Sequence, residues 1–160
     1  MTVRVQREPF DAGAEIARLH GADPAVGAVA TFIGIARDAN DGEAVGKLVL
    51  EHYPGMTERA LAGIVERARA RWRLIDALVI HRVGELAPSD PIVLVAVSSA
   101  HRAEAFDACR FMVDYLKTEA PFWKKELAPD GAERWVEARH SDDEARAQWE
   151  RRVPETGERR

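Results

Sequence analysis

The sequence predicts an α+β domain in which helices flank a mostly antiparallel sheet. Segments that alternate apolar and polar residues, a pattern typical of strands, are mixed with segments whose apolar residues recur at helical spacing. The two kinds of segment do not alternate strictly, as they do in parallel βαβ folds, and short turns join neighbouring strands. No repeat or linker divides the chain, so we expect residues 1–152 to form one domain and residues 153–160 to form a disordered tail.

The first half of the chain is expected to contain strands that alternate with helices and one long loop. Asp11 can cap a helix that follows it, because its side-chain oxygen can accept a hydrogen bond from a free backbone N–H. Gly34 interrupts a β-branched stretch and indicates a bulge or a close approach to the backbone. The polar residues 37–43 predict a mobile loop. The expected elements are strands over 3–5, 25–35 and 47–53 and helices over 11–21 and 57–72.

The second half is expected to contain two strand pairs, each followed by a helix. Residues 86–90 indicate a hairpin-like connection in the first pair, and Pro129-Asp130-Gly131 predicts the turn of the second. Residues 141–144 form a capping box that would open the last helix. The long helix has an apolar stripe made of Phe106, Cys109, Val113 and Leu116. The expected elements are strands over 75–83, 91–99, 122–126 and 133–137, and helices over 103–118 and from 141 onward.

The overall composition excludes several classes of partner and compartment. A net charge of −4 gives no basic field, so neither nucleic acid nor a membrane surface is expected as a partner. The N-terminus has no apolar signal-peptide stretch, and the longest apolar run, residues 92–97, is too short to span a bilayer. The single cysteine, Cys109, lies on an apolar helix stripe and predicts a buried structural thiol in a reducing compartment. We therefore expect a cytoplasmic protein.

Positively charged side chains at the ends of several elements could form an anion-binding pocket. A helix start offers free N–H groups and the positive end of the helix dipole, both of which favour a bound anion. Arginine adds a planar fork that matches phosphate, and a lysine amine can act as an acid, a base or a nucleophile. The candidate residues are Arg37, His101, Arg102, Lys117, Lys124 and Lys125.

Each candidate also has an ordinary structural interpretation. Lys117 can be a solvated residue at a helix end, and the Lys124-Lys125 pair can protect an edge strand. Arg37 can lie on a surface turn, and a second histidine–arginine pair, His81-Arg82, is expected to be structural. The histidines lack metal-ligand spacing and no glycine-rich phosphate loop occurs, so no metal and no cofactor are expected. Spacing alone therefore assigns a function to none of these residues.

Five segments, taken together, resemble the molybdopterin synthase large-subunit family. They occur in the family's order and spacing across nearly the whole chain, up to about Trp149. One such motif would be suggestive, whereas five in register are highly specific. The segments are Phe32-Ile33-Gly34-Ile35-Ala36-Arg37, Leu50-Glu51-His52-Tyr53-Pro54-Gly55-Met56, Ile80-His81-Arg82-Val83-Gly84-Glu85-Leu86, Ser98-Ser99-Ala100-His101-Arg102-Ala103-Glu104-Ala105-Phe106 and Leu116-Lys117-Thr118-Glu119-Ala120-Pro121-Phe122-Trp123-Lys124-Lys125-Glu126.

The resemblance implies an α/β-hammerhead fold and a sulfurtransferase of molybdenum cofactor biosynthesis, with residues 1–152 as its catalytic domain. Two copies would form a homodimer within a heterotetramer, each binding a small ubiquitin-like sulfur-carrier subunit that ends in a Gly-Gly thiocarboxylate. The substrate would be cyclic pyranopterin monophosphate, and two sulfurs added in succession would give molybdopterin. Because the sulfur would arrive on the partner, this chain would need neither a reactive cysteine nor a cofactor.

The resemblance also implies roles for individual residues, carried over by motif. Lys117 and Lys124 would be catalytic. Ala36 stands where the family often has a β-branched residue before the arginine, and we expect this departure to be harmless. The residues that would bind the substrate are Ile35, Ala36, Arg37, His101, Arg102, Lys117, Lys124, Lys125 and Glu126.

The sequence leaves two other functions open. A non-catalytic module could use an exposed sheet edge and the same basic cleft to bind an acidic or Gly-Gly peptide tail. A phosphohydrolase or nucleotide-binding enzyme could also use a cationic site, although the sequence shows no carboxylate set for a metal. Product formation separates the sulfurtransferase from the binding module, and metal-dependent release of phosphate would support the phosphohydrolase.

Overall fold

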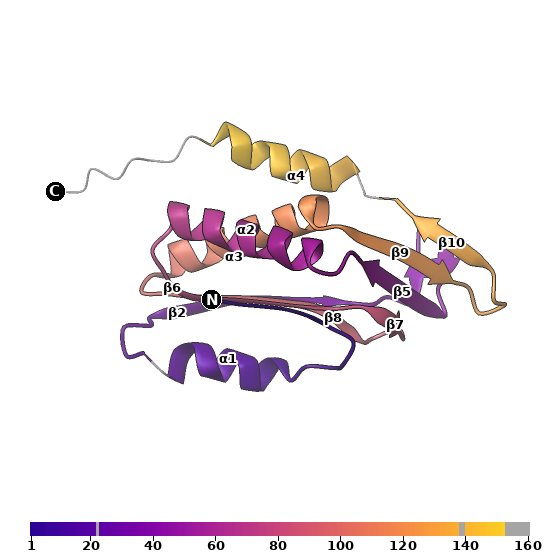
Figure 1. The fold of residues 1–160 in the computed structure, drawn as a ribbon, viewed down its shortest axis with the longest axis horizontal. Helices are drawn as coiled ribbons and strands as arrows, with labels where there is room; N and C mark the ends of the chain where they lie inside the picture. The colour runs from indigo at the N-terminus through magenta and orange to yellow at the C-terminus, as the bar shows by residue number, and fades with distance from the viewer. Residues whose placement is uncertain (22, 138–139, 153–160) are drawn as a thin grey trace.

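Helices cover both faces of a central sheet in the computed structural model, which describes residues 1–21, 23–137 and 140–152 (Figure 1). One helix, α1, lies on one face, α2 and α3 lie on the other, and α4 lies outside them. In chain order the elements are β1 (Thr2–Gln6), α1 (Ala12–Gly21), β2 (Ala28–Ile35), β3 (Ala39–Asn40), β4 (Glu43–Ala44), β5 (Lys47–His52), α2 (Met56–Arg71), β6 (Leu74–Arg82), β7 (Gly84–Leu86), β8 (Pro91–Ser99), α3 (Arg102–Glu119), β9 (Phe122–Leu127), β10 (Glu133–Val136) and α4 (His140–Arg151).

The larger sheet has the strand order β1-β6-β8-β2. Its β6–β8 and β8–β2 pairs are antiparallel, whereas β1 runs parallel to β6. Strands β6 and β8 are covered on both faces, which explains why their sequences are nearly continuous apolar runs rather than alternating ones. The predicted α+β class with mostly antiparallel strands is confirmed. Within the described residues, no helix combines the length and the apolar character needed to cross a bilayer.

Two apolar clusters hold the layers of the larger sheet together. On one face, Leu61 of α2 and Phe111 of α3 are almost completely buried. On the other face, Leu19 of α1 packs with Ile80 of β6. Removing one such side chain from water contributes about 1.5–3 kcal/mol. The helices are therefore held mainly by their apolar faces.

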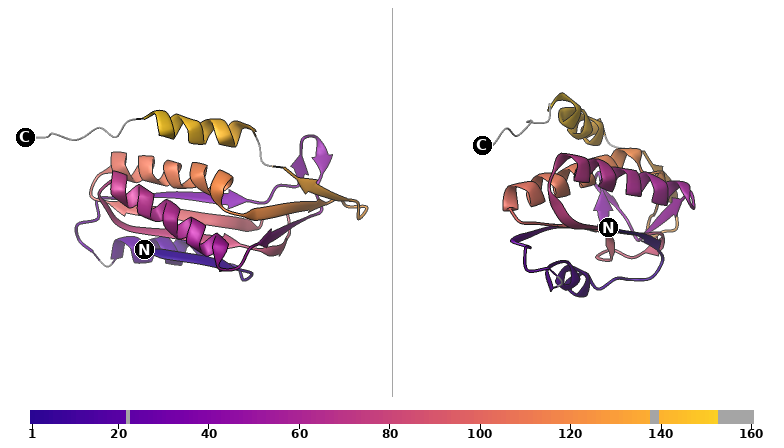
Figure 2. Two further views of the ribbon diagram at one scale, coloured as in Figure 1. Left: turned by 45° about the horizontal axis from the view of Figure 1, so that its top comes forward. Right: turned by 60° about the vertical axis from the view of Figure 1, so that its left-hand side comes forward.

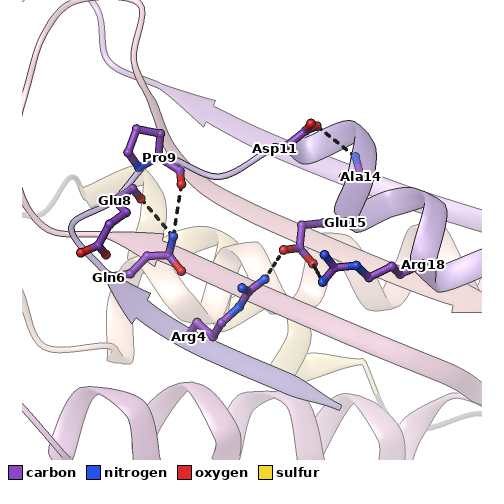
Figure 3. A network of polar contacts seen from close by, with 8 residues as sticks. All are labelled: Arg4, Gln6, Glu8, Pro9, Asp11, Ala14, Glu15 and Arg18. Carbon is purple, nitrogen blue, oxygen red and sulfur yellow. Dashed lines mark hydrogen bonds and ion pairs between the residues drawn. The ribbon is translucent and has the colours of Figure 1, made fainter.

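Polar contacts fix the start of α1 against β1 (Figure 3). The Oδ1 atom of Asp11 accepts a hydrogen bond from the backbone N–H of Ala14 at 3.0 Å, so the predicted helix cap is confirmed. Glu15, one turn into the helix, forms ion pairs with Arg4 of β1 and, at 3.3 Å, with Arg18. The cap and these ion pairs together set the direction in which α1 crosses the sheet.

The smaller sheet, with the order β10-β9-β5-β7, extends beyond the helices at one end of the molecule (Figure 1, Figure 2). All its pairings are antiparallel. The two arms predicted around Pro129-Asp130-Gly131 are β9 and β10, and Gly131 has the positive φ of 88° that favours glycine. Strand β7 was not predicted, because three residues are too few for an alternating pattern to show.

Gly34 was predicted to mark either a bulge or a close approach to the backbone, and both are present. The register between β2 and β8 shifts between Gly34 and Ile35, which is a bulge. A Cβ atom on Gly34 would lie 2.8 Å from Cγ1 of Val93, so the neighbouring strand also approaches closely. The bulge redirects the chain at the end of β2, just before Arg37.

Three predictions about local structure are wrong. Residues 37–43 do not form a loop without structure, because β3 and β4 form a small hairpin in which the Asn40 side chain is buried against a distant strand. Phe106 is not on the buried stripe of α3, since it is 67% exposed and the buried face runs through Ala105, Ala108 and Met112 instead. Helix α4 begins at His140, so Ser141 lies inside it and is not the residue before its first turn.

Helix α4 is fixed to the outside of the helical layer by Trp149. This side chain is 4% exposed and its ring meets those of Trp72 and Phe111 edge to face, with centroid distances of 5.8 and 5.6 Å. Its Nε1 donates a hydrogen bond to Oδ2 of Asp114 at 2.7 Å. The predicted tail at 153–160 lies outside the described residues.

Candidate active site

A small hollow lies where the larger and smaller sheets meet. Its volume is about 300 Å³, counting the part that is open to solvent. The end of β2, the start of β8, strands β5 and β9 and the β3–β4 hairpin surround it. The hairpin stands at the same end of the molecule as β9 and β10 (Figure 2). The residues that line it are Ile35, Ala36, Arg37, Ala39, Asn40, Val45, Leu48, Ile92, Lys124 and Glu126.

The end of β2 forms one wall of the hollow and is fixed by backbone hydrogen bonds. The N–H of Ala36 donates to the carbonyl of Asp90 at 2.9 Å, and the N–H of Ser89 donates to the carbonyl of Ala36 at 2.8 Å. Ala36 itself is buried, whereas Arg37 is exposed. The guanidinium of Arg37 donates a hydrogen bond to Oδ1 of Asn40 at 3.5 Å. A cation is thus present at the rim of a rigid wall.

Glu126 is the most buried charged residue of the hollow, at 4% exposure. Its Oε1 accepts a hydrogen bond from Nδ2 of Asn40 at 2.8 Å, and its Oε2 accepts one from Nη2 of Arg134 at 2.5 Å. Burial alone would raise the pKa of the Glu126 carboxyl, but the hydrogen bond from Arg134 and the charge of Lys124 outweigh burial and lower it. Glu126 is therefore an anion at neutral pH.

Lys124 points into the hollow from the same face of β9 as Glu126, two residues away. Its Nζ lies 3.5 Å from Oε1 of Glu126, and its side chain is 37% exposed. The ammonium group therefore has an anchoring anion on one side and access to solvent on the other. An amine in this position can meet a bound anion or exchange a proton with it.

Lys125 lies on the opposite face of β9, as expected for the next residue along a strand. Its Nζ forms an ion pair with Glu133 at 3.3 Å and lies 5.4 Å from the ring centroid of Trp135. Lys125 is not among the residues that line the hollow, so within one chain the structure does not bring it together with Lys124.

Lys117 lies in the last turn of α3, at the end of the helix that leads into β9 (Figure 1). The connection is fixed by a hydrogen bond of 3.1 Å that Oγ1 of Thr57 donates to the carbonyl of Pro121. The Lys117 side chain is exposed. The structure thus places Lys117 at the end of the molecule that carries the hollow, although not in its lining.

His101 and Arg102 lie at the other end of the larger sheet. They open α3 just after Ser99, whereas the hollow is lined by Ile92 at the start of β8. The nine residues of β8 separate these ends by about 26 Å, at roughly 3.3 Å a residue. Both side chains are exposed. Within one chain, these two residues therefore do not meet Arg37 and Lys124.

The sequence reasoning missed two residues that contact Glu126, namely Asn40 and Arg134. Asn40 is 86 positions away along the chain, so no local pattern could indicate the contact. Arg134 could have been found. Once the two arms are aligned around the turn at 129–131, the register places Arg134 directly opposite Glu126, a favourable cross-strand pair.

Two other titratable residues are structural, as predicted. The ring of His81 is buried and stacks on Phe122 with a centroid distance of 3.8 Å, and burial lowers its pKa to about 4. Cys109 is a buried free thiol whose pKa burial raises to about 11, which makes it a poor nucleophile. The described part of the chain contains no group of three or more histidine, cysteine, aspartate or glutamate residues placed to hold a metal.

Comparison with known proteins gives the family. Residues 5–119 match the family model described as MoaE protein. The chain belongs to the MoaE family. A MoaE relative from Ralstonia nicotianae, named molybdopterin synthase catalytic subunit, is 64% identical over 148 residues, which cover 92% of this chain and 84% of the relative.

Solved structures of MoaE proteins agree with this assignment. A molybdopterin biosynthesis MoaE protein from Burkholderia ambifaria superimposes with a TM-score of 0.79 and 53% identity, covering 93% of this chain and 97% of that one. A chain from a complex of subunits 1 and 2 of molybdopterin-converting factor from Helicobacter pylori has a TM-score of 0.68 at 16% identity, covering 86% and 90%, which supports a likeness of fold alone. The predicted family and fold class are confirmed.

Proposed function

We propose that this MoaE chain is the catalytic subunit of a molybdopterin synthase. It converts cyclic pyranopterin monophosphate to molybdopterin with two sulfurs from the thiocarboxylated C-terminus of a small sulfur-carrier subunit. The shared name of its relatives confirms the predicted class of enzyme, a sulfurtransferase subunit. The observation that supports the reaction best is a cationic hollow on a chain whose net charge is −4.

The charges around the hollow leave one positive charge for an anionic ligand. Of the residues that line the hollow, Arg37 and Lys124 are cations and Glu126 is a carboxylate. A phosphate or thiocarboxylate about 4 Å from the Lys124 amine would gain roughly 4 kcal/mol at an effective dielectric constant of 20. This attraction is enough to orient an anion at the hollow, and both substrates of the proposed reaction are anions.

The proposed roles follow from where each side chain lies. Lys124 holds the thiocarboxylate and assists proton transfers as the sulfur attacks and the cyclic phosphate opens. Arg37 and the backbone of Ile35 and Ala36 bind the phosphate and the pterin at the rigid end of β2. Lys117, at the same end of the molecule, is the second catalytic lysine. Glu126 anchors Lys124.

His101 and Arg102 complete the proposed substrate site only if a second copy of the chain contributes, whereas Lys125, next to Lys124 on β9, would meet the substrate outside the lining of the hollow. The length of β8 keeps the start of α3 away from the hollow of its own chain. Strand β2 pairs on one side only within the described residues, and the exposed Ile33 and Phe106 lie along β2 and on the helix packed against it. A homodimer formed through this edge would cover both apolar side chains.

The remaining parts of the proposal concern the partner and the setting. The small subunit inserts its C-terminal tail into the hollow. Because the large chain forms a homodimer and each copy binds one small subunit, two chains of each kind form a heterotetramer. Residues 1–152 act as a single catalytic domain in the cytoplasm, without a cofactor, and neither nucleic acid nor a membrane is a partner. The negative charge of the tail and the positive charge of the hollow support this pairing.

Reconstitution tests the proposed reaction. The purified chain is mixed with thiocarboxylated small subunit and precursor, and the dithiolene product is measured. An enzyme yields product from the complete mixture, whereas a non-catalytic binding module yields a stable complex without product. Formation of that complex alone would contradict the proposed function.

Mixed dimers test whether each hollow is shared between two copies. Lys124→Ala and Arg102→Ala chains, each inactive alone, are unfolded together and refolded. If the two residues of one hollow come from different chains, a mixed dimer contains one intact hollow and activity returns in part. Absence of any recovery in verified mixed dimers would show that the hollow is not shared in this way.

A further inference from the structure

Arg134 connects three segments around the hollow. Its Nη2 lies 2.5 Å from Oε2 of Glu126 on β9, and its Nη1 pairs with Glu43 on β4. The Glu43 side chain is 70% exposed, whereas that of Glu126 is only 5% exposed. Solvent and salt therefore screen the contact with Glu126 much less than the contact with Glu43.

The two oxygens of Glu126 have different partners. Oε2 accepts the hydrogen bond from Arg134, and Oε1 accepts one from Asn40 and faces the amine of Lys124. A carboxylate is planar, so holding Oε2 also fixes the direction in which Oε1 points. The charged contact with Arg134 is the strongest of these restraints, because a charge-assisted bond exceeds a bond from a neutral amide.

We propose that Arg134 is a positioning residue for Lys124 and acts through Glu126. Because Arg134 holds Oε2 of the carboxylate, Oε1 remains available to anchor the Lys124 amine at the mouth of the hollow. This inference rests on the proposed role of Lys124 in the sulfur-transfer reaction. It assigns to β10 a part in the reaction, although no residue of β10 lines the hollow.

The arrangement determines what happens without Arg134. The carboxylate is then free to turn both oxygens toward Lys124 and draw the amine away from the hollow. It also loses the hydrogen bond that opposes the effect of burial on its pKa, so the carboxyl becomes easier to protonate. The first change misplaces the Lys124 amine and the second weakens its ion pair with Glu126, although Arg134 itself is not among the lining residues.

Turnover by the complete synthase tests the inference. Arg134→Ala should lower turnover at saturating precursor by roughly tenfold or more, since small displacements of a reacting group have effects of this size, and should leave KM within about twofold. Arg134→Lys, which retains the charge, should recover part of the loss. The control is Glu85→Gln, which removes the exposed 3.2 Å pair with Lys47 in the same sheet and should leave turnover unchanged.

A double-variant comparison separates positioning from a general structural effect. In a Glu126→Gln background, adding Arg134→Ala should cause no further loss, because the residue through which Arg134 acts is already changed. Independent, multiplying losses in the two variants would overturn the inference. If Arg134→Ala does not fold, Arg134→Gln keeps the size of the side chain and tests the same charge.

Titration of the Glu126 carboxyl by NMR tests the contact without relying on activity. In Arg134→Ala the pKa of this carboxyl should rise, and the acid limb of the turnover profile should move to higher pH with it. A lower melting temperature with an unchanged titration would mean that Arg134 is only structural. Absence of product from the unaltered protein would instead contradict the proposed function, while the titration would still decide whether Arg134 controls Glu126.

Discussion

The larger and smaller sheets bury different kinds of side chain. In the larger sheet, α2 and α3 cover an apolar face, and residues such as Phe111 and Val95 have almost no exposed surface. In the smaller sheet, the buried side of β9 carries the carboxylate of Glu126, with Lys124 beside it. Burying a charge is unfavourable unless partners compensate it, and here Asn40 and Arg134 do so.

This difference indicates a division between stability and function. The hydrophobic effect does not depend on the exact orientation of each buried side chain. Apolar burial around the larger sheet supplies most of the folding free energy. The polar contacts around Glu126 contribute less to stability, but they fix the direction of each charged group. A cationic hollow that must hold two anions requires such fixed directions. The variants below test the division, beginning with the largest expected effect.

Phe111→Ala should affect stability and leave the chemistry of the hollow intact. The Phe111 ring lies between Trp72, Tyr115 and Trp149, at centroid distances of 5.3, 4.4 and 5.6 Å. Truncation leaves a cavity, so the free energy of unfolding should fall by about 3–5 kcal/mol. Urea denaturation measures the loss, and Phe111→Leu should lose much less. Turnover per folded molecule should not change. A large fall in turnover would show that the apolar core also controls the chemistry of the hollow.

Lys124→Ala should have the opposite effects. Removing the amine should lower turnover by roughly 100-fold or more, or about 2.7 kcal/mol of transition-state stabilisation, with little change in melting temperature. Lys117→Ala should likewise abolish conversion while the fold is kept. The matched control is Lys47→Ala, which removes an exposed lysine of β5 in the same sheet. Near-normal turnover by Lys117→Ala or Lys124→Ala would contradict the assigned role of that lysine.

His81 provides a test at the junction of the two sheets, because it lies on β6 and stacks on Phe122 of β9. Burial lowers its pKa to about 4 in the folded chain, whereas an unfolded histidine titrates near 6.5. The unfolded state therefore binds more protons between these values, and stability falls as the pH falls from 6.5 toward 4. The loss between pH 7.5 and pH 5 should be about 2 kcal/mol.

The control for this pH dependence is His81→Phe, which retains an aromatic ring opposite Phe122. Urea denaturation at both pH values should show a smaller loss on acidification in His81→Phe than in the unaltered protein. Glu126, whose pKa is lowered from 4.5 in the folded chain, loses its contribution only below that pH, so it does not affect this comparison. An equal loss in the two proteins would mean that His81 does not control acid stability.

The same division explains how much of the molecule could be predicted from the sequence. Elements of the larger sheet follow from local patterns, such as the apolar run of β8 and the bulge at Gly34. The error at Phe106 has a physical cause. Helical spacing places Phe106 at the margin of the apolar stripe, and only the packing of α3 against β2 and β8 decides that Ala105 faces inward.

The site was predictable only in part. Arg37, Lys124 and Glu126 were found by resemblance to the MoaE family, and the structure brings them to one hollow. Asn40 was expected in a mobile loop, because its contact with Glu126 joins residues that no local pattern relates. The spacing of residues along the sequence also could not indicate that the length of β8 separates Arg102 from this hollow.

The smallest expected effect concerns Asp11, the cap of α1, which can be recognised from neighbouring residues in the sequence alone. Asp11→Ala removes the acceptor for the N–H of Ala14 at the start of α1 and should lower the free energy of unfolding by about 1 kcal/mol. Asp11→Ser keeps an acceptor and should lose only a few tenths of a kcal/mol. Chemical denaturation measures both. Helix α1 lies on the face of the larger sheet opposite α2 and α3 (Figure 1), so neither variant should change turnover. A change in turnover from so small a loss would mean that the two sheets are coupled, and that the direction of the groups around Glu126 depends on the packing of α1.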